Sequence, residues 1–361
     1  MKVVVNYVSK HSYLYAQKMV EGLLANDCEV FAIVSKNMPE IDAWRKMQNI
    51  ILYEVDGYTT IKSFPFKLLK FLVCDVIKIR KRVKDMEIQQ NFCPFVSYWS
   101  PFVNLALKNL PLTFVMHDPI PHEGKDKIIG WFNTYMGRVA KNIIVLSKQF
   151  EDFVKNKYSA KVMVVQGGVE VENFDDKVEL LKYDESRINF VFQGRIEKYK
   201  GLEILASAYK TLLKKYEDKI FLVVAGSGDF RPYADLFDNL PNCCILNQWL
   251  TNAEVIGLFN DRNTICVLPY TSATQSGVIN VAMPCGTPII ASACGGIIEQ
   301  IRDNVTGWLV APGDVDALVS KMSYVIEHRE KWENIRQGGY EHVKALKWDN
   351  LAHKIMEGFK L

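Results

Sequence analysis

The sequence predicts an α/β protein that contains two doubly wound parallel sheets, each covered by helices on both faces. Its 361 residues are enough for about two domains, at roughly 100–200 residues per domain. Short runs rich in Val and Ile alternate with amphipathic segments, which is the βαβ pattern of a buried parallel sheet. The pattern stops in a polar segment at residues 173–187 and then starts again. This segment therefore indicates a connection between two domains.

The predicted elements follow this alternation along the chain. The first half has strands at 3–8, 29–35, 112–116, 142–146 and 162–165 and a helix at 13–25. The second half has strands at 188–193, 220–225, 264–269 and 288–291 and helices at 201–216, 278–284, 297–302, 320–327 and 350–359. Two such domains are expected to meet at a cleft, and ligands of parallel sheets bind beyond the carboxyl ends of the strands. We therefore expect the functional residues directly after strands.

Composition excludes several classes of protein. Lys and Arg number 44 against 41 Asp and Glu, and a net charge of +3 is too small for wholesale nucleic-acid binding. The 8 cysteines form no CxxC pair and accompany no histidine cluster, which argues against a structural metal site and favours a reducing compartment. No stretch of about 18 apolar residues is free of charge. We therefore expect a cytoplasmic protein without a membrane span, a metal or a cofactor.

The first candidate site follows the strand at 188–193. Gly194 and Arg195 come directly after it, and Lys200 precedes the next helix. Two cations at such a junction can bind a diphosphate through charge-assisted hydrogen bonds, each contributing about 1.5–3 kcal/mol. A solvated, charged helix start has the same spacing, so both interpretations stay open.

Two further junctions have the same strand-to-helix design. Residues 270–277, which include Thr274, Gln275, Ser276 and Gly277, follow the strand at 264–269. Their backbone amides could hold a phosphate, although N-capping by Ser276 explains them equally well. Glu299 follows a Gly-Gly pair and could simply favour the helix dipole. Three such junctions in one domain favour a nucleotide or phosphate site.

Other motifs narrow the chemistry. Residues 225–229 contain Gly226 but lack the third glycine of a dinucleotide fingerprint and the Lys of a P-loop, which argues against hydride transfer and ATP hydrolysis. His117 and Asp118 follow the strand at 112–116. A histidine beside an aspartate at a strand end is a candidate for substrate contact, and a structural histidine is the alternative.

These segments together resemble the family 4 retaining glycosyltransferases, whose GT-B fold consists of two Rossmann-like doubly wound domains that face each other across a cleft. The resemblance covers most of the second half. It rests on Gly194-Arg195-Ile196 with Lys200-Gly201, on 223–228, 247–250, 282–290, Gly295-Gly296 with Glu299, and 306–310, and on 166–169 with Phe174. It implies an N-terminal domain at 1–170, a nucleotide-sugar domain at 171–349 and a last helix, 350–361, that packs back on the first domain.

The resemblance also implies roles for individual residues. Arg195 and Lys200 would stabilise the departing nucleoside diphosphate in place of a divalent metal, and His117 would contact the transferred sugar. The donor, with UDP-sugars favoured, would be bound by Gly194, Gly226, Gln248, Trp249, Thr274, Gln275, Ser276, Gly277 and Glu299. His11 and Asp118 are assigned to the acceptor or sugar side.

The chain departs from the family pattern in two places. Ala273 and Val281 stand where the family commonly has two glutamates eight positions apart, and a similar sub-group has Thr-Gln-Ser-Gly in this loop. We read this as a variant donor site in which amides and polar side chains substitute. Residues 9–12, which include His11, replace the Gly-rich loop after the first strand.

Residues 62–87 form a basic stretch interleaved with apolar side chains. Such a stretch can lie on an anionic bilayer, with about 1 kcal/mol from each surface Lys or Arg, or it can be a solvated helix with one core face. Because many family members act on lipid-linked saccharides, we expect peripheral contact with the inner membrane face.

The leading expectation is therefore a metal-independent, hexosyltransferase-type retaining glycosyltransferase. It would move a sugar from a nucleoside-diphosphate sugar to a saccharide or lipid-linked acceptor in cell-surface polysaccharide synthesis. The missing carboxylates at Ala273 and Val281 leave two alternatives open. These are a catalytically silent partner subunit that binds nucleotide-sugar, and a nucleotide-sugar epimerase.

Overall fold

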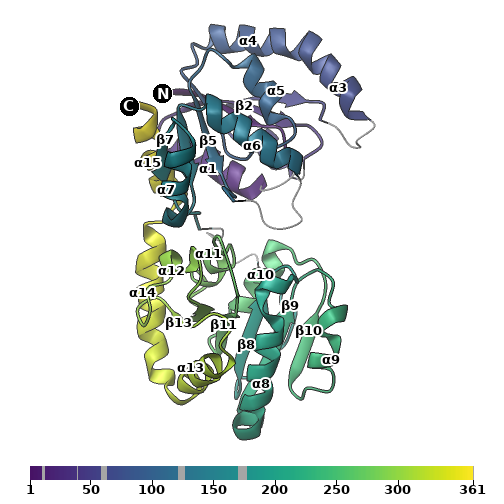
Figure 1. Ribbon diagram of the computed structural model, residues 1–361, viewed down its shortest axis with the longest axis vertical. Coiled ribbons are helices and arrows are strands. Elements are labelled where there is room, and N and C mark those ends of the chain that lie inside the picture. The colour runs from purple at the N-terminus through teal and green to yellow at the C-terminus, as the bar shows by residue number, and fades with distance from the viewer. Residues whose placement is uncertain (10–12, 39, 58–62, 121–126, 170–176, 361) are drawn as a thin grey trace. The chain divides into compact units, whose positions relative to one another are not determined.

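The structure is a computed structural model that describes residues 1–9, 13–38, 40–57, 63–120, 127–169 and 177–360. The chain divides into two compact units. Unit 1 comprises Met1–Gly168 and Leu346–Leu361, and unit 2 comprises Val169–Ala345. Each unit contains one parallel sheet with helices on both faces (Figure 1). The predicted fold class of two Rossmann-like α/β sheets is confirmed.

The sheet of unit 1 has the strand order β3-β2-β1-β4-β5-β6-β7, and all neighbouring strands are parallel. Its strands are β1 (Lys2–Tyr7), β2 (Glu29–Ser35), β3 (Ile50–Val55), β4 (Gln90–Cys93), β5 (Leu112–Met116), β6 (Asn142–Val145) and β7 (Lys161–Val164). The sequence patterns predicted five of these strands to within one residue at each end. They missed β3 and β4.

Helices cover both faces of this sheet. They are α1 (Tyr13–Ala25), α2 (Ile41–Lys46), α3 (Phe64–Lys70), the π-helical turn η2 (Phe71–Asp75), α4 (Val76–Asp85), α5 (Ser100–Ala106), α6 (Lys127–Val139), α7 (Glu151–Lys157) and α15 (Trp348–Lys360). Short 3₁₀ turns at Lys148–Phe150 and elsewhere complete the connections.

The alternation of β1 explains the two-faced core of unit 1. Val3 and Val5 belong to an apolar cluster with α1 and α15, whereas Val4 belongs to a second cluster with η2 and α4. All three valines are fully buried. A strand with both faces covered requires such a continuous apolar run, and this is the feature that the sequence shows.

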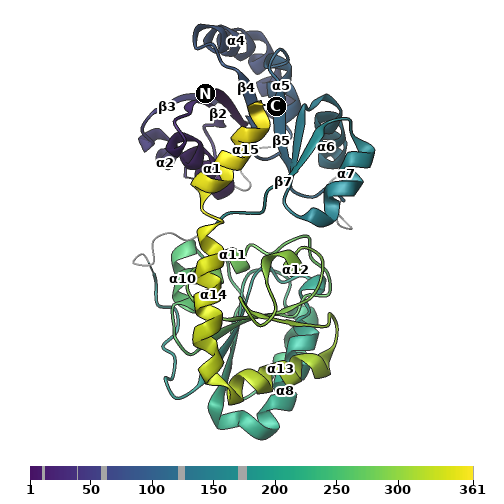
Figure 2. The same ribbon diagram turned by 90° about the vertical axis from the view of Figure 1, so that its left-hand side faces the viewer.

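The last helix, α15, returns to unit 1 after the chain has completed unit 2. Figure 2 shows it beside α1. The Asn26 amide donates to the Asp349 carbonyl at 2.8 Å, and the Gln90 amide donates to the Phe359 carbonyl at 3.2 Å. Leu351 and Ile355 are buried in the same cluster as β1. Helix α15 therefore completes the hydrophobic core of unit 1.

The sheet of unit 2 has the order β10-β9-β8-β11-β12-β13, again all parallel. Its strands are β8 (Ile188–Gln193), β9 (Ile220–Ala225), β10 (Cys243–Leu246), β11 (Thr264–Leu268), β12 (Ile289–Ser292) and β13 (Trp308–Val310). Its helices are α8 (Leu202–Tyr216), α9 (Ala234–Phe237), α10 (Asn252–Phe259), α11 (Ile279–Ala282), α12 (Ile297–Gln300), α13 (Val315–Glu327) and α14 (Trp332–Lys344).

Helices α11 and α12 are shorter than predicted. The predicted 278–284 helix ends at Ala282, because Pro284 has no N–H to continue it and Gly286 has φ +71°. The predicted 297–302 helix ends at Gln300, since Ile301 turns into extended conformation and is buried. Both helices are therefore single turns.

Strand β8 marks the point at which the connections change direction. The chain runs from β8 to β9 and β10 on one side, and then crosses to β11, β12 and β13 on the other. The connections that follow β8 and β11 therefore lead to opposite sides of the sheet, and open parallel sheets bind their ligands at such a point.

Candidate functional site

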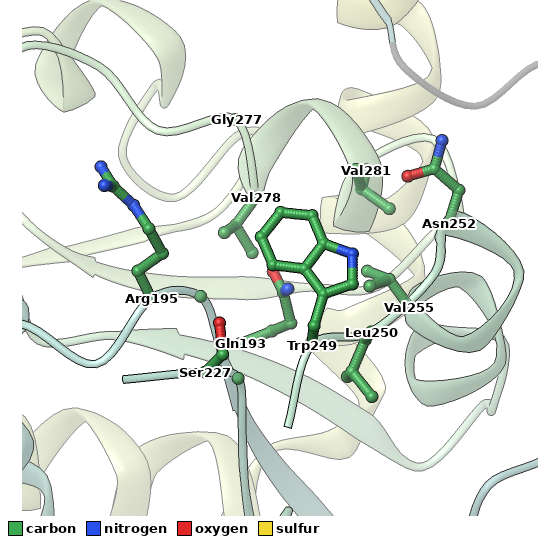
Figure 3. A pocket seen from close by; sticks show the side chains of 12 residues that line it. Gln193, Arg195, Ser227, Trp249, Leu250, Asn252, Val255, Gly277, Val278 and Val281 are labelled. Carbon is green, nitrogen blue, oxygen red and sulfur yellow. The ribbon is translucent and has the colours of Figure 1, made fainter. Parts of the chain in front are cut away.

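A pocket of about 200 Å³ lies at this switch point of unit 2. It lies beyond the carboxyl ends of β8 and β9, between α10 and the loop that leads into α11. Its lining residues are Gln193, Gly194, Arg195, Gly226, Ser227, Trp249, Leu250, Asn252, Val255, Gly277, Val278 and Val281, most of them labelled in Figure 3. The structure thus brings together five of the predicted site residues: Gly194, Arg195, Gly226, Trp249 and Gly277.

The floor of the pocket forms because the loops after β8 and β9 run side by side. The amide of Gly194 donates to Ala225 and the amide of Ile196 donates to Ser227, both at 3.0 Å. Gly226 has φ +146°, and a Cβ there would collide with the Gly194 carbonyl. Only glycine allows this close approach, and Gly194 and Gly226 contribute backbone alone to the floor.

Arg195 stands at the rim of the pocket (Figure 3). Its side chain is 64% exposed, and its guanidinium pairs with Glu197 at 3.0 Å. An exposed pair of this kind contributes little stability. The guanidinium can therefore exchange Glu197 for an anionic ligand at small cost.

Lys200, by contrast, is buried and only 8% exposed. Its Nζ lies 3.8 Å from the centroid of the Tyr270 ring and 5.1 Å from that of Tyr199. Burial lowers the pKa of Lys200 to about 8, and the charge of Arg195 acts in the same direction. A Cβ on Gly194 would lie 3.8 Å from this Nζ, so the ammonium lies beneath the Gly194 backbone of the floor. Lys200 itself is not among the residues that line the pocket.

Gly201 lets Lys200 turn inward. It has φ +70°, and a Cβ there would collide with the Pro269 carbonyl. The loop after β8 is also tied to the loop after β11, because the Thr271 amide donates to the Tyr199 carbonyl at 2.8 Å. The buried cation is thus fixed between two loops.

The loop after β11 has backbone amides that could bind phosphate, but the Ser276 amide is not one of them. The Ser276 amide donates to the Gln300 side chain at 2.8 Å, so it is already used within the protein. The amides of Gln275 and Gly277 have no acceptor within the described part of the chain. Gly277 lines the pocket, whereas Thr274, Gln275 and the 2%-exposed Ser276 do not.

The opposite wall is built by the segment before α10. Trp249 is 77% exposed, and its indole stands between Arg195 and Asn252 in Figure 3. A capping box starts α10: the Thr251 amide donates to Glu254 at 2.7 Å and the Glu254 amide donates to Thr251 at 3.3 Å. This box places Asn252 and Val255 at the pocket.

Several lining residues were not predicted from the sequence, among them Ser227, Asn252 and Val255. The Thr-x-x-Glu spacing at Thr251 is a signal that could have located the start of α10. Gln248 is exposed and Glu299 is half-buried, and neither lines the pocket. None of the described residues that line the pocket has a carboxylate, and Val281 contributes only methyl groups.

The predicted residues of the N-terminal half lie in unit 1. The His117 Nε2 is 2.9 Å from the Pro94 carbonyl, which can only accept, so Nε2 carries the proton. The ring also packs against Tyr15 and Phe95, with centroids 5.0 and 5.1 Å away. Asp118 follows it and is half-buried. His11 lies outside the described residues.

Among the described residues, no three or more His, Cys, Asp and Glu side chains are grouped so that they could hold a metal ion. No helix in this part of the chain is long and apolar enough to cross a bilayer.

Residues of the second unit resemble a known family of enzymes. Residues 173–342 match the family described as glycosyl transferases group 1. An uncharacterized glycosyltransferase of Methanocaldococcus jannaschii is 26% identical over 244 residues, 61% of this chain and 60% of that protein. A second from the same organism is 25% identical over 351 residues, 89% of this chain and 86% of that protein.

The name of another relative states the sugar that the enzyme transfers and its acceptor. The phosphatidyl-myo-inositol mannosyltransferase of Mycobacterium leprae is 23% identical over 232 residues, 64% of this chain and 60% of that protein. The chain thus spans about three fifths of the length of this protein and of the first relative.

Solved structures match both units. Sucrose-phosphate synthase from Thermosynechococcus elongatus has a TM-score of 0.73 at 18% identity, over 99% of this chain and 98% of that one. Anabaena HepE in complex with UDP has a TM-score of 0.72 at 14% identity, over 100% of both chains. At these identities the matches establish the fold.

Proposed function

Because residues 173–342 match the glycosyl transferases group 1 and both sheets match solved structures with the GT-B fold, we propose that the chain is a retaining glycosyltransferase whose donor is a nucleoside-diphosphate sugar bound in unit 2. The acceptor is a saccharide or a lipid-linked saccharide. The observation that carries the proposal is the pocket at the switch point, where Arg195 lies at the rim and the Lys200 ammonium lies beneath the floor. Two cations at one pocket suit a diphosphate, which carries several negative charges.

The two cations have different tasks in this mechanism. As the sugar–phosphate bond breaks, negative charge develops on the departing diphosphate, and a cation aimed at that charge lowers the barrier. Lys200 is fixed and desolvated, so its interaction with phosphate is strong, whereas Arg195 closes on the ligand from the surface. The free amides of Gln275 and Gly277 add donors for the distal phosphate.

Retention follows in the proposal from attack on the face that the leaving group occupies. The oxygen of the departing phosphate accepts the proton of the acceptor hydroxyl while the new glycosidic bond forms. Arg195 and Lys200 supply the positive charge that a divalent metal would otherwise provide. His117, held by Pro94, is assigned to the transferred sugar, and Asp118 and His11 to the acceptor side.

We infer that the nucleotide is a uridine nucleotide. The related HepE fold has been solved with UDP and with UDP-glucose, which supports this choice. The exposed indole of Trp249 offers a flat apolar face at the pocket, to which a nucleobase can stack.

The acceptor side of the proposal concerns the surface of unit 1. Four apolar residues on the continuous helix α3–η2–α4 point to solvent: Phe66, Leu69, Val73 and Ile77, each at least 59% exposed. We name these four residues the apolar stripe. Exposed cations accompany them at Lys70, Lys78, Lys81, Arg82 and Lys84, without an ion-pair partner among the described residues.

An apolar stripe accompanied by cations fits an anionic membrane surface, where a lipid-linked acceptor would be presented. The relative from M. leprae carries the name of an enzyme that acts on phosphatidyl-myo-inositol, which supports a lipid acceptor here. We therefore propose a peripheral enzyme of the inner membrane face in cell-surface polysaccharide synthesis.

The function is tested with purified protein and a panel of uridine, guanosine, adenosine and thymidine diphosphate sugars. We expect slow release of a nucleoside diphosphate from one donor without acceptor, and persistence of this activity in EDTA. Arg195→Ala should lower the rate on the order of 10²–10³-fold, because a few kcal/mol of transition-state stabilisation are lost.

Other outcomes would favour the alternatives. Tight donor binding with no turnover supports a silent partner subunit, and interconversion of donor sugars without release of diphosphate supports an epimerase. Full activity of the Arg195→Ala enzyme would overturn the site assignment.

A further inference from the structure

Ser276 is occupied entirely by contacts inside unit 2. Its amide donates to the Gln300 Oε1 at 2.8 Å, and its carbonyl accepts from the Gln300 Nε2 at 3.1 Å. Its hydroxyl lies 3.4 Å from the Tyr270 hydroxyl, a long hydrogen bond in which either group can donate. Ser276 is only 2% exposed. It therefore anchors its loop instead of contacting a ligand.

The side chain of Gln300 is buried, and its hydrogen bonds are with Ser276 and Asn280. It is 7% exposed and sits at the end of the single-turn helix α12. Besides the two bonds to Ser276, its Nε2 lies 3.4 Å from the Asn280 Oδ1. A buried amide that meets both backbone groups of one residue fixes that residue in position and orientation. The neighbouring amides of Gln275 and Gly277 are fixed with it.

Tyr270 continues this set of contacts to the buried cation. Its ring is fully buried, and the Lys200 Nζ lies 3.8 Å from the ring centroid. A cation at this distance from an aromatic face is attracted by the negative potential of the ring, most strongly where water is excluded. One residue, Tyr270, thus touches both Lys200 and Ser276.

We propose that Tyr270, Ser276 and Gln300 are positioning residues that hold the Lys200 ammonium and the amides of Gln275 and Gly277 in one fixed arrangement around the donor diphosphate. We call these three residues the positioning chain. The inference rests on the proposed function, because it assumes a diphosphate at this pocket. The cation follows β8 and the amides follow β11, so a link between the two loops sets the distance between the groups that bind phosphate.

The positioning chain should affect the binding of the phosphates and not that of the nucleoside. UDP carries the phosphates and uridine does not, so loss of the chain should weaken UDP and leave uridine unchanged. Gln300→Met keeps the side-chain length but removes the amide. We expect at least a ten-fold loss of UDP affinity by calorimetry, and no change for uridine by ligand-observed NMR.

Variants of Tyr270 separate its two contacts. Tyr270→Phe keeps the ring beneath Lys200 and should weaken UDP only a few-fold. Tyr270→Leu removes the ring and should weaken UDP more. It should also shift the loss of UDP affinity at alkaline pH to a lower pH, since the ammonium loses its aromatic partner. The charged or titratable groups that act on Lys200 are Arg195, Glu197, Cys266 and Cys294, together with the tyrosines Tyr199 and Tyr270, and these variants leave all but Tyr270 in place.

A matched control and a double variant complete the experiment. Gln337→Met changes an exposed glutamine whose amide meets Glu341 at 3.3 Å, and it should bind both ligands as wild type. Because Tyr270 and Gln300 act through the same serine, the effects of Tyr270→Phe and Gln300→Met should not add.

The outcomes distinguish the inference from the function on which it rests. If Lys200→Met leaves UDP affinity unchanged, the assigned pocket and with it the proposed function are wrong. If Lys200→Met weakens UDP while Gln300→Met and Tyr270→Leu do not, only the positioning chain is wrong. Equal losses for UDP and uridine would also overturn it, because a general distortion of the unit would affect both. Should Gln300→Met fail to fold, the two Tyr270 variants decide the question.

Discussion

Lys200 illustrates how one residue combines burial with charge. Burial alone favours the neutral amine, and the pKa of Lys200 is accordingly lowered to about 8. Near neutral pH the ammonium nevertheless remains the major form, stabilised by the Tyr270 ring at 3.8 Å. A cation that is poorly hydrated before the ligand arrives loses little solvation when phosphate binds.

This pKa predicts how donor binding depends on pH. UDP needs the charged form of Lys200, so above the second pKa of its terminal phosphate, about 6, its affinity should fall as the pH rises through the Lys200 pKa of about 8. The slope approaches about ten-fold per pH unit until the higher pKa of the complex is reached. Calorimetric titration of UDP across this range provides the measurement.

Lys200→Met serves as the control for that titration. It should bind UDP weakly with an affinity that no longer changes over the alkaline range. An unchanged slope in this variant would assign the titration to another group.

At the scale of the element, the helix α3–η2–α4 carries apolar residues on two faces. Phe71 and Ile79 are fully buried against the sheet, whereas the apolar stripe points to solvent. Among the cations, Lys67 is paired with Asp56 at 2.9 Å. The Arg80 guanidinium donates to the carbonyls of Leu105 and Ala106, the last two residues of α5. The helix therefore has the core face that one interpretation expects, and its exposed apolar stripe leaves membrane contact a prediction.

The membrane proposal predicts charge-dependent binding. The purified protein should float with anionic liposomes and lose this binding at high salt. Simultaneous reversal of Lys70, Lys78, Lys81 and Lys84 to Glu should lower partitioning by at least about 10²-fold, at about 1 kcal/mol for each charge lost from the surface.

Four exposed lysines of unit 2 provide a control with the same change in net charge. They are Lys210, Lys214, Lys219 and Lys331, and their reversal to Glu should leave flotation nearly unchanged. Equal losses in both quadruple variants would mean that net charge, and not this helix, determines binding.

At the scale of the whole molecule, the chain crosses between its units and then returns. Leu351 of α15 is 1% exposed within the core of unit 1, although unit 2 separates it in sequence from the rest of that unit. The stability of unit 1 therefore depends on the last turns of the chain, while the pocket residues all belong to unit 2.

This arrangement predicts that a core defect in α15 spares the pocket. Leu351→Ala should lower the free energy of unfolding of unit 1 by about 2–5 kcal/mol through lost burial and a cavity. Its UDP affinity should match wild type. Thermal unfolding with and without UDP checks this, because UDP stabilises only the unit that binds it.

Lys354→Ala is the matched control, since Lys354 is exposed on the same helix. It should unfold as wild type. A loss of UDP affinity in Leu351→Ala that Lys354→Ala does not share would show that the two units are energetically coupled.

The predictability of the fold differs among its strands for a physical reason. β8 and β9 were predicted with their observed bounds because β9 is a continuous apolar run and β8 contains only Asn189 and Gln193 as polar residues. β4 was missed because Gln90 and Asn91 are polar, although both are buried. Their burial depends on distant partners: Gln90 bonds to Phe359, and Asn91 bonds to Asn104 at 2.8 Å. Nothing in the local sequence indicates such partners.

The candidate site residues likewise divide into those that the local sequence predicts and those that depend on distant partners. Gly194 and Arg195 could be singled out from the sequence because they directly follow a strand, whereas the resemblance to a known family suggested that they and Gly226 bind a donor. Tyr270 and Gln300 could not, because they act through Ser276 and not on a ligand. The sequence also predicted that the Ser276 amide binds phosphate, because nothing in the sequence shows that this amide donates to the Gln300 side chain.

The sequence by itself determined the α/β class, the two-unit organisation of the pattern and the strand ends at which the candidate site residues lie. These follow from local periodicity and turn chemistry, which act over a few residues. Only the tertiary structure decided that β8 lies between β9 and β11 and that the apolar stripe on α3–η2–α4 faces outward. Those outcomes depend on packing between segments far apart in the chain, and packing is a property of the whole fold.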